Sequence, residues 1–216
     1  NFDYQNIKLM VSDMDSTLIT IETIDEVAKE VGLKDEISLI TEAAMQGHLD
    51  FTESFKKRLS ILKGVSNSSF ESVYNKKVEF SPGAKVLIEY FKSNQIRTAV
   101  VSGGLSFFAK KLQSQLGIDN CRANNVEIIN QSITGNVIGN VIDAKEKAKY
   151  IDELCDQYKL KNDQVIAIGD GANDIEMMKV AGLSVAYHAK PILKQYCDIQ
   201  INYGSLASLI DFFEYA

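Results

Sequence analysis

The stretch Ile7-Lys-Leu-Met-Val-Ser-Asp-Met-Asp-Ser-Thr17 lies near the start of the chain, and it is an apolar run that ends in acidic and hydroxyl residues. A short, mostly apolar run of this kind is typical of a strand buried on both faces of a parallel sheet. Three later runs have the same character: Arg97 to Ser102, Val165 to Gly169 and Leu183 to Tyr187. Because helical patterns separate these runs, the sequence predicts an α/β fold with a doubly wound, mostly parallel sheet.

Three of the intervening helices are marked by their ends or by their spacing. Ser81 is a candidate N-cap with Pro82 at the first helical position, which predicts a helix from Pro82 to Ser93. A second helix is predicted from Leu105 to Leu116, where Gly117 ends it. A third is predicted from Ala144 to Tyr158, because apolar residues recur there at helical spacing.

Residues 23 to 77 interrupt the alternation, because they hold helical patterns and no strand pattern. The segment Thr23-Ile-Asp-Glu26 matches a capping box at the start of the first of these helices. Further helices are predicted from about Asp35 to Met45 and from about Thr52 to Leu62. The simplest account is a helical cap inserted after the first strand, which must pack on itself and over the sheet to bury a core.

A second, smaller insertion is predicted at Val126 to Val141, where the pattern indicates a hairpin that turns near Asn130 and Gln131. The sequence thus predicts an α/β catalytic core of residues 1–20 and 78–216, a helical cap of residues 21–77, and a hairpin of about residues 126–141 within the core.

The composition is that of an ordinary globular protein. The 216 residues include 45% hydrophobic ones, which excludes a disordered, collagen-like or coiled-coil chain as a global description. The formal net charge of −6 opposes binding to a polyphosphate backbone, and no basic cluster offsets it locally. We therefore expect no nucleic-acid partner, and the oligomeric state stays open.

Targeting and redox features are sparse. No apolar run approaches the roughly 20 residues of a membrane span, and the first residues lack the basic start and apolar core of a signal peptide. Cys121, Cys155 and Cys197 are odd in number and contain no CxxC spacing, which favours reduced, packed thiols over disulfides or zinc. The expectation is a cytoplasmic protein without a membrane partner.

Acidic and phosphate-binding residue types recur after three of the predicted strands. These clusters are Asp13-Met-Asp-Ser-Thr17, Ser102-Gly-Gly104 and Gly169-Asp-Gly-Ala-Asn-Asp174. Ligands of open α/β sheets bind at the carboxyl ends of the strands, so we expect the clusters to share one crevice. The aspartates would concentrate negative charge there, and oxygen ligands of this kind suit Mg²⁺.

Positive charge and backbone N–H groups are the second requirement of an anion site. The segment Ser102-Gly-Gly104 is predicted to open a helix whose free N–H groups would attract a phosphate, although a simple glycine turn explains the same residues. Lys147 can supply a fixed positive charge, but Lys145 and Lys149 lie close to it in sequence, and spacing alone does not choose among the three.

Arg58 is unusual because it lies on the apolar stripe formed by Phe55, Leu59 and Leu62. Two interpretations are open. The guanidinium group extends to the surface along its own apolar stem, or it turns inward and clamps a substrate carboxylate.

These motifs resemble those of the haloacid dehalogenase superfamily, whose first motif is matched by Asp13-Met-Asp-Ser-Thr-Leu18 and whose last motif is matched by Gly169-Asp-Gly-Ala-Asn-Asp174. The resemblance runs from about Ile7 to the C-terminus. Stretches in the cap, namely Glu22 to Glu26, Ala44 to Gly47 and Phe51 to Arg58, are similar to the branch that hydrolyses phosphoserine.

The resemblance implies roles for individual residues. Asp13 would be the nucleophile and Asp15 the general acid and base. Mg²⁺ would be held by Asp13, the backbone carbonyl of Asp15, and Asp170, with Asp174 supporting its water shell. The implied phosphate-binding residues are Ser102, Gly103, Lys147 and Asn173, and the Gly103 carbonyl matches a further substrate contact.

In the cap, Glu22 would face the substrate ammonium group, Arg58 its carboxylate, and Met45 and Phe51 its apolar part.

The implied reaction is the Mg²⁺-dependent hydrolysis of O-phosphoserine to serine and phosphate through an aspartyl phosphate, the last step of serine biosynthesis. Two alternatives stay open. One is a related phosphatase or phosphotransferase that acts on another small phosphomonoester, and the other is a binding protein that senses a phosphorylated metabolite without turnover. The complete motifs argue against the binding protein, because loss of turnover commonly accompanies loss of these residues.

Overall fold

A single seven-stranded sheet forms the centre of the computed structural model, which describes residues 4–45 and 48–214. The strand order is β4-β3-β2-β1-β5-β6-β7, and only the β3–β4 pair is antiparallel. The strands are β1 (Leu9–Ser12), β2 (Arg97–Leu105), β3 (Asn120–Ile129), β4 (Ser132–Ile138), β5 (Val165–Gly169), β6 (Leu183–Tyr187) and β7 (Ile199–Ile201). The predicted doubly wound, mostly parallel sheet is therefore confirmed.

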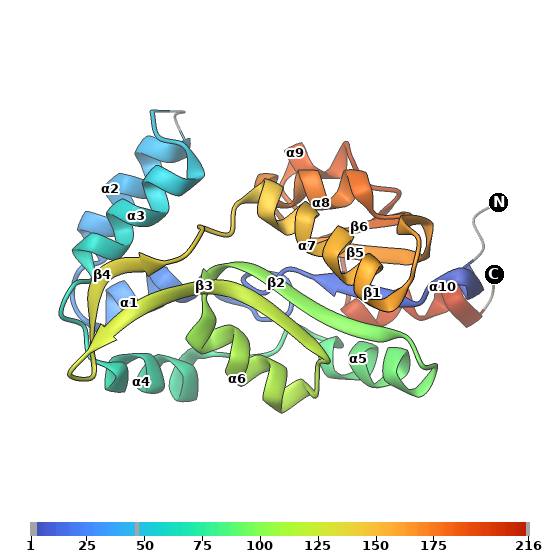
Figure 1. Ribbon diagram of the computed structural model, residues 1–216, viewed down its shortest axis with the longest axis horizontal. Helices are drawn as coiled ribbons and strands as arrows, with labels where there is room; N and C mark the ends of the chain where they lie inside the picture. The colour runs from blue at the N-terminus through green and yellow to red at the C-terminus, as the bar shows by residue number, and fades with distance from the viewer. Residues whose placement is uncertain (1–3, 46–47, 215–216) are drawn as a thin grey trace.

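Helices cover both faces of this sheet (Figure 1). They are α1 (Thr23–Glu30), α2 (Lys34–Met45), α3 (Phe51–Ile61), α4 (Asn67–Lys77), α5 (Ala84–Ser93), α6 (Ser106–Leu116), α7 (Ala144–Tyr158), α8 (Ile175–Val180), α9 (Pro191–Lys194) and α10 (Asp211–Glu214). Helices α5 and α6 lie on one face, and α7 and α8 lie on the other (Figure 1).

Strand β1 is apolar at nearly every position because it contributes to two cores. Leu9 and Val11 belong to the apolar cluster that includes the buried side chains of α7, whereas Met10 belongs to the cluster that includes those of α5 and α6. Successive side chains of a strand point to opposite faces, so both faces of a covered sheet demand apolar residues. Strand β1 lies between β2 and β5, and its carboxyl end thus opens at the middle of the sheet.

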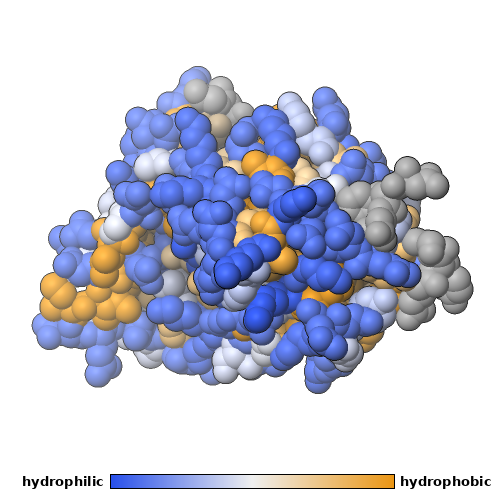
Figure 2. Space-filling model, turned by 45° about the vertical axis from the view of Figure 1, so that its right-hand side comes forward, coloured by the Kyte–Doolittle hydropathy of each residue, from blue (hydrophilic) through white to orange (hydrophobic). Residues whose placement is uncertain are grey.

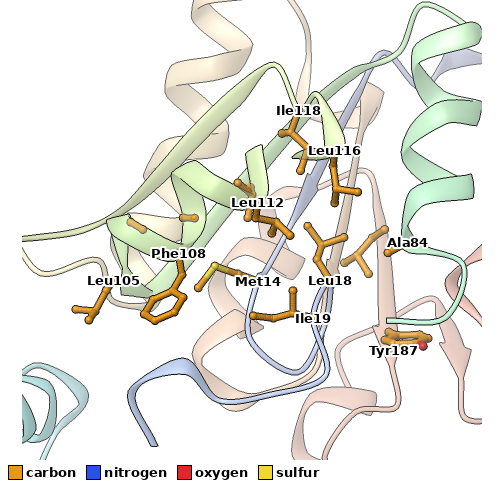
Figure 3. Packing of buried hydrophobic residues seen from close by; sticks show 14 of the residues in the cluster. Met14, Leu18, Ile19, Ala84, Leu105, Phe108, Leu112, Leu116, Ile118 and Tyr187 are labelled. Carbon is orange, nitrogen blue, oxygen red and sulfur yellow. The ribbon is translucent and has the colours of Figure 1, made fainter. Parts of the chain in front are cut away.

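The residue between the first two aspartates anchors the loop after β1. Met14 is fully buried and lies among the side chains of the α6 residues Phe108 and Leu112 (Figure 3). With Met14 held in the core, Asp13 and Asp15 on either side of it line a pocket above the sheet.

Helices α1 to α4 follow β1, and no named strand occurs in the described residues from 23 to 77. Within this group α1 contacts α2 and α4, and α2 contacts α3. The group also reaches the rest of the molecule, because α3 contacts β4 and α4 contacts α6. The division of the chain into a core, a cap and a hairpin insertion stays a prediction.

The predicted capping box at Thr23 and Glu26 is wrong. Thr23 is already inside α1, whose N-cap is Glu22, and the Thr23 hydroxyl donates a hydrogen bond to Asp15 Oδ2 at 3.1 Å. The hydroxyl is thus engaged by a carboxylate of the loop after β1 and caps no backbone N–H of the helix. A capping box does occur at α3, where Asp50 accepts from Glu53 N at 2.7 Å and Glu53 accepts from Asp50 N at 3.2 Å.

The start of α5 also differs from the prediction. The helix begins at Ala84 with Gly83 as its N-cap, and Gly83 has a φ of 79°. The chain turns here because it packs against a distant segment: Pro82 O accepts from Leu206 N at 2.8 Å, and a Cβ at Gly83 would lie 2.5 Å from Ala207 N. Tertiary packing therefore displaces the helix start predicted at Ser81 and Pro82.

The segment Ser102-Gly-Gly104 does not open a helix as predicted, since β2 continues to Leu105 and α6 begins at Ser106. The β2–β3 register shifts between Val101 and Leu105, which marks a bulge at these glycines. The sequence interpretation ended the strand too early because glycines usually weaken a strand.

Two parts of the sheet were not predicted. Strand β3 starts at Asn120 and pairs in parallel with β2 before it pairs with β4, and the polar residues at its start hide it from a search for apolar runs. Strand β7 has only three residues. The turn between β3 and β4 lies at Asn130 and Gln131, both with positive φ.

The face of the molecule drawn in Figure 2 is mostly hydrophilic, with smaller apolar groups near its middle and an apolar group at its left edge, the side on which the β3–β4 ribbon lies in Figure 1. The exposed hydrophobic residues of that ribbon are Ile128, Ile129 and Ile138. Within the described ranges 4–45 and 48–214, no helix combines the length and the apolar character that crossing a bilayer would require.

Candidate active site

A pocket of about 740 Å³ lies over the carboxyl ends of β1, β2 and β5. The sheet side of this pocket is formed by loops that follow these strands, and the opposite side is formed by residues of α1, α2 and α3. Of the predicted site residues, the pocket lining includes Asp13, Asp15, Glu22, Phe51, Arg58, Ser102, Gly103, Asp170 and Asn173. The fold thus brings together side chains from positions 13 to 173.

Lys147 forms the charged centre beneath this pocket. Its side chain is completely buried, and its ammonium group lies 2.9 Å from Asp13 Oδ1 and 2.7 Å from Asp174 Oδ1. Burial alone would lower the pKa of Lys147, but Asp13 and Asp174 outweigh burial and raise the pKa above its ordinary value. Lys147 therefore stays charged. Geometry distinguishes it from Lys145 and Lys149, which are exposed.

Asp174 holds the loop after β5 in place. Its Oδ2 accepts hydrogen bonds from the backbone N–H groups of Asp170 and Gly171, both at 3.1 Å, while its Oδ1 accepts from Lys147. A Cβ at Gly169 would overlap the Asp174 carboxylate, so the close approach requires glycine there. Asp174 is fully committed to this network, which fits a supporting role better than a direct contact with a ligand.

Three buried carboxylates form a group that can hold a metal ion. One oxygen from each of Asp13, Asp170 and Asp174 lies within 4.8 Å of the others. Burial and the charge of Asp174 raise the pKa of Asp13 to about 8 and the pKa of Asp170 to about 7. A divalent cation reverses this effect because it stabilises the ionised carboxylates. The donor set fits a hard cation with oxygen ligands.

Asp15 lies between the group of three carboxylates and the helices on the opposite side of the pocket. Its Oδ2 accepts from Thr23, and its Oδ1 is buried without a hydrogen-bond partner. Burial, followed by the charges of Glu22 and Asp13, raises the pKa of Asp15 well above its ordinary value. A protonated carboxyl group is thus favoured here, which is what a proton donor requires.

The bulge at the end of β2 presents backbone and hydroxyl groups to the pocket. Ser102 is buried, and its Oγ accepts from Gly104 N at 2.9 Å. A Cβ at Gly103 would lie 2.5 Å from the Phe51 ring, and a Cβ at Gly104 would lie 2.8 Å from Asp15 Oδ2. Both glycines are therefore required by close neighbours, one from α3 and one from the loop after β1.

Arg58 turns into the pocket. Its Nε is buried and has no hydrogen-bond partner, and burial lowers its pKa while the nearby charges of Asp25 and Glu22 raise it. Glu22 also lines the pocket, and its Oε1 accepts from the Ser16 hydroxyl at 2.7 Å. The pocket thus carries the Arg58 guanidinium group and the carboxylates of Glu22 and Asp25. These groups lie opposite the group of three aspartates at the sheet side.

Met45 and Asn173 are the remaining predicted site residues. The structure gives Met45 as the last residue of α2, but its side chain lies outside the described residues. Asn173 lines the pocket in the short turn after β5, beside Gly171, where a Cβ would lie 2.6 Å from Asn173 Oδ1.

The sequence interpretation missed several residues at the site. Asp25 lines the pocket near Arg58, and its position three residues after Glu22 on one helix face could have indicated this. Lys190 lines the pocket from the segment after β6, and its N–H donates to Asp170 O at 2.8 Å. Thr23, which bonds to Asp15, was assigned to a helix cap.

Comparisons with known proteins agree with this geometry. A family model described as haloacid dehalogenase-like hydrolase matches residues 10–179. The chain is 43% identical over 211 residues to a phosphoserine phosphatase from Polaromonas sp., which covers 95% of this chain and 89% of the relative.

Two solved structures are also similar. One is a phospho-aspartyl intermediate analogue of phosphoserine phosphatase, and the other is a substrate-bound phosphoserine phosphatase complex. Each is 37% identical to this chain with a TM-score of 0.88. Each match covers 95% of this chain and 98% of the solved chain. The chain belongs to the haloacid dehalogenase-like hydrolase family. Within that family its place is among the phosphoserine phosphatases.

Proposed function

We propose that this chain hydrolyses O-phosphoserine to serine and inorganic phosphate, the last step of serine biosynthesis. The observation that carries the proposal is the pairing of two unlike groups across one pocket. The buried Asp13–Lys147 pair lies at the sheet side, and Arg58 lies opposite it among the carboxylates of Glu22 and Asp25. The first pair suits a phosphate, and the second group suits an amino acid.

In the proposed first step, Asp13 attacks phosphorus. A carboxylate oxygen of Asp13 forms the new P–O bond, and the bond between phosphorus and the serine oxygen breaks. Lys147, 2.9 Å from Asp13, reduces the repulsion between the carboxylate and the phosphate dianion. Ser102, the Gly103 backbone and Asn173 line the same pocket from loops at the sheet side and would hold the remaining phosphate oxygens.

Asp15 would move the proton in both steps. It gives its proton to the serine oxygen as that oxygen leaves, and then takes a proton from the water that attacks the aspartyl phosphate. The second attack regenerates the Asp13 carboxylate and releases phosphate. The raised pKa of Asp15 and its unpartnered Oδ1 support this role, because the group is protonated at the start and one oxygen is free to reach a ligand.

The carboxylate group would hold Mg²⁺ through Asp13, Asp170 and the backbone carbonyl of Asp15, with Asp174 in support. Three oxygens within 4.8 Å of one another, in a setting that raises the pKa of Asp13 and Asp170, support this assignment. When bound, Mg²⁺ neutralises negative charge that is shared between the carboxylates and the phosphate.

The residues of α1 and α3 would bind the amino-acid part of the substrate. Arg58 would pair with the substrate carboxylate, and Glu22, together with Asp25, would face the ammonium group. Phe51, whose ring packs against Gly103, would cover the apolar part along with Met45. The buried and unpartnered Arg58 Nε and Asp25 Oδ1 support this, since a ligand would satisfy them.

A cytoplasmic location is part of this proposal. The three cysteines, Cys121, Cys155 and Cys197, are all free, as expected for a chain in a reducing compartment.

The decisive assay is release of inorganic phosphate from L-phosphoserine, with phosphothreonine and an aryl phosphate as rival substrates, each with Mg²⁺ and with a chelator. We expect Mg²⁺-dependent turnover with a clear preference for phosphoserine. Turnover of the rivals alone would keep the aspartate chemistry and reject the substrate. A transfer of phosphate to an added alcohol in preference to water would indicate a phosphotransferase, and no turnover at all would indicate a binding protein.

The stability of the metal-free protein should fall as the pH rises. Asp13 and Asp170 have a pKa of about 8 and about 7 in the folded state, against 3.8 ordinarily. The folded state therefore binds more protons than the unfolded state between these values, and protons are lost on unfolding, so the free energy of unfolding decreases from about pH 4 to about pH 8.

Thermal denaturation in chelator over this pH range checks the sign. Added Mg²⁺ should raise the Tm, and by more at pH 8 than at pH 6, because the cation binds the ionised carboxylates of the folded state. A Tm that rises with pH in chelator, or a Mg²⁺ effect that is larger at pH 6, would contradict the assignment of this cluster.

A further inference from the structure

Asn124 connects two segments of the candidate site without lining the pocket itself. It lies on β3 beside Leu105 of β2, and it is 1% exposed. Its Nδ2 donates to Gly103 O at 2.8 Å, and its Oδ1 accepts from Ile142 N at 2.8 Å. The two ends of one buried amide are thus bonded to two different loops.

The first of these loops is the bulge at the end of β2. The peptide between Gly103 and Gly104 is held at both ends, since its C=O accepts from Asn124 and its N–H donates to Ser102 Oγ at 2.9 Å. A serine hydroxyl that accepts from a backbone N–H still has its own hydrogen to donate. Because Ser102 lines the pocket, this hydrogen is available to a phosphate oxygen there.

The second loop leads into α7, the helix that carries Lys147. Ile142 directly precedes Asp143, the N-cap of α7, whose side chain accepts from Glu146 N at 2.9 Å. The backbone N–H of Lys147 donates to Asp143 O at 2.9 Å. A bond that fixes Ile142 therefore fixes the first turn of α7 relative to β2.

We propose that Asn124 is a positioning residue for the phosphate-binding part of the pocket. It acts through the Gly103–Gly104 peptide, which sets the direction of the Ser102 hydroxyl, and through Ile142, which places the helix of Lys147. None of the described hydrogen bonds of Asn124 reaches α1 or α3, so its removal acts more strongly on phosphate binding than on amino-acid binding. This inference rests on the proposed function, because it takes Ser102 and Lys147 as groups that bind phosphate.

The test uses Asn124→Leu, which keeps a similar size and loses both hydrogen bonds. Asn124→Ser, which is smaller and remains polar, is the second variant if the leucine variant does not fold. Thr98→Val is the matched control, because Thr98 is also a buried polar residue of the sheet and is bonded to Asp119 at 3.0 Å. Isothermal titration calorimetry with Mg²⁺ present measures the Kd of inorganic phosphate and, separately, of L-serine.

We expect the Asn124 variants to weaken phosphate binding by about tenfold or more, the size of a lost hydrogen bond to a charged group, and to weaken serine binding by a clearly smaller factor. Thr98→Val should lower the Tm without changing either Kd. Equal weakening of both ligands, or unchanged phosphate binding in a folded variant, would overturn the proposal. If the wild-type protein binds phosphate but neither turns over phosphoserine nor binds serine, the proposed substrate is rejected. The comparison of phosphate Kd values between the wild type and the Asn124 variants still tests the positioning role.

Discussion

Replacing Asp13 with Asn is expected to lower kcat for phosphoserine by at least about a thousandfold, the scale seen when a nucleophile is removed. The amide has nearly the same shape as the carboxylate, so the fold should persist. Its amide oxygen carries no negative charge and is a far weaker nucleophile than a carboxylate oxygen. It also removes one of the two carboxylates that neutralise Lys147, which leaves Asp174 as the only remaining charged partner in the described contacts of that lysine.

The measurement is phosphate release under single-turnover and steady-state conditions, with the Tm as a check on folding. Asp211→Asn is the matched control, because Asp211 is an exposed aspartate at the start of α10 and outside the pocket. The control should retain wild-type kcat. If Asp13→Asn lost less than about tenfold in kcat, the nucleophile would have to be sought elsewhere, since a missing nucleophile cannot cost so little.

Replacing Arg58 with Ala is expected to raise the KM for phosphoserine by about a hundredfold, which corresponds to the loss of a charge-assisted, bidentate contact in a partly buried site. The same change should alter the KM for an aryl phosphate by less than about threefold, because an uncharged leaving group makes no use of the guanidinium. The difference between the two substrates is the informative quantity.

Lys57→Ala is the matched control for Arg58, since Lys57 is the preceding residue of α3 and its side chain is exposed. It should leave both KM values unchanged. The Tm of Arg58→Ala must also be measured, because the change removes the positive charge that most lowers the pKa of Asp25. An equal rise of KM for both substrates would remove the assignment of Arg58 to the carboxylate and make it a general determinant of the pocket.

Much of the sheet could be predicted from the sequence because its central strands lie in a uniform environment. Strands β1, β5 and β6 are buried along their whole lengths, so each of them is a short apolar run that local pattern reveals. Strand β3 begins with Asn120, Cys121 and Arg122 at a partly exposed position of the sheet, and pattern fails there. The residues next to a strand position in the sequence do not determine which other strand that position will pair with.

The helix ends were predicted correctly where the reason for them is local. Gly117 ends α6 in a left-handed conformation that glycine adopts at little cost, as its position after an apolar stripe indicates. The predictions at Ser81 and Thr23 were wrong because distant groups outweigh the local preference. Residues 206 and 207 contact the turn before α5, and Asp15 takes the Thr23 hydroxyl.

The sequence by itself determined which chemistry this chain carries, since the aspartates after β1 and β5 and the glycines near the end of β2 lie at short, fixed distances from the apolar runs of these strands. A chain that forms these strands must bring such residues to one edge of the sheet. Only the tertiary structure decided which of three lysines is buried between Asp13 and Asp174, that Arg58 turns inward toward Asp25, and that Asn124 joins Gly103 to Ile142. Those contacts depend on distances between segments far apart in the chain, which local spacing does not fix.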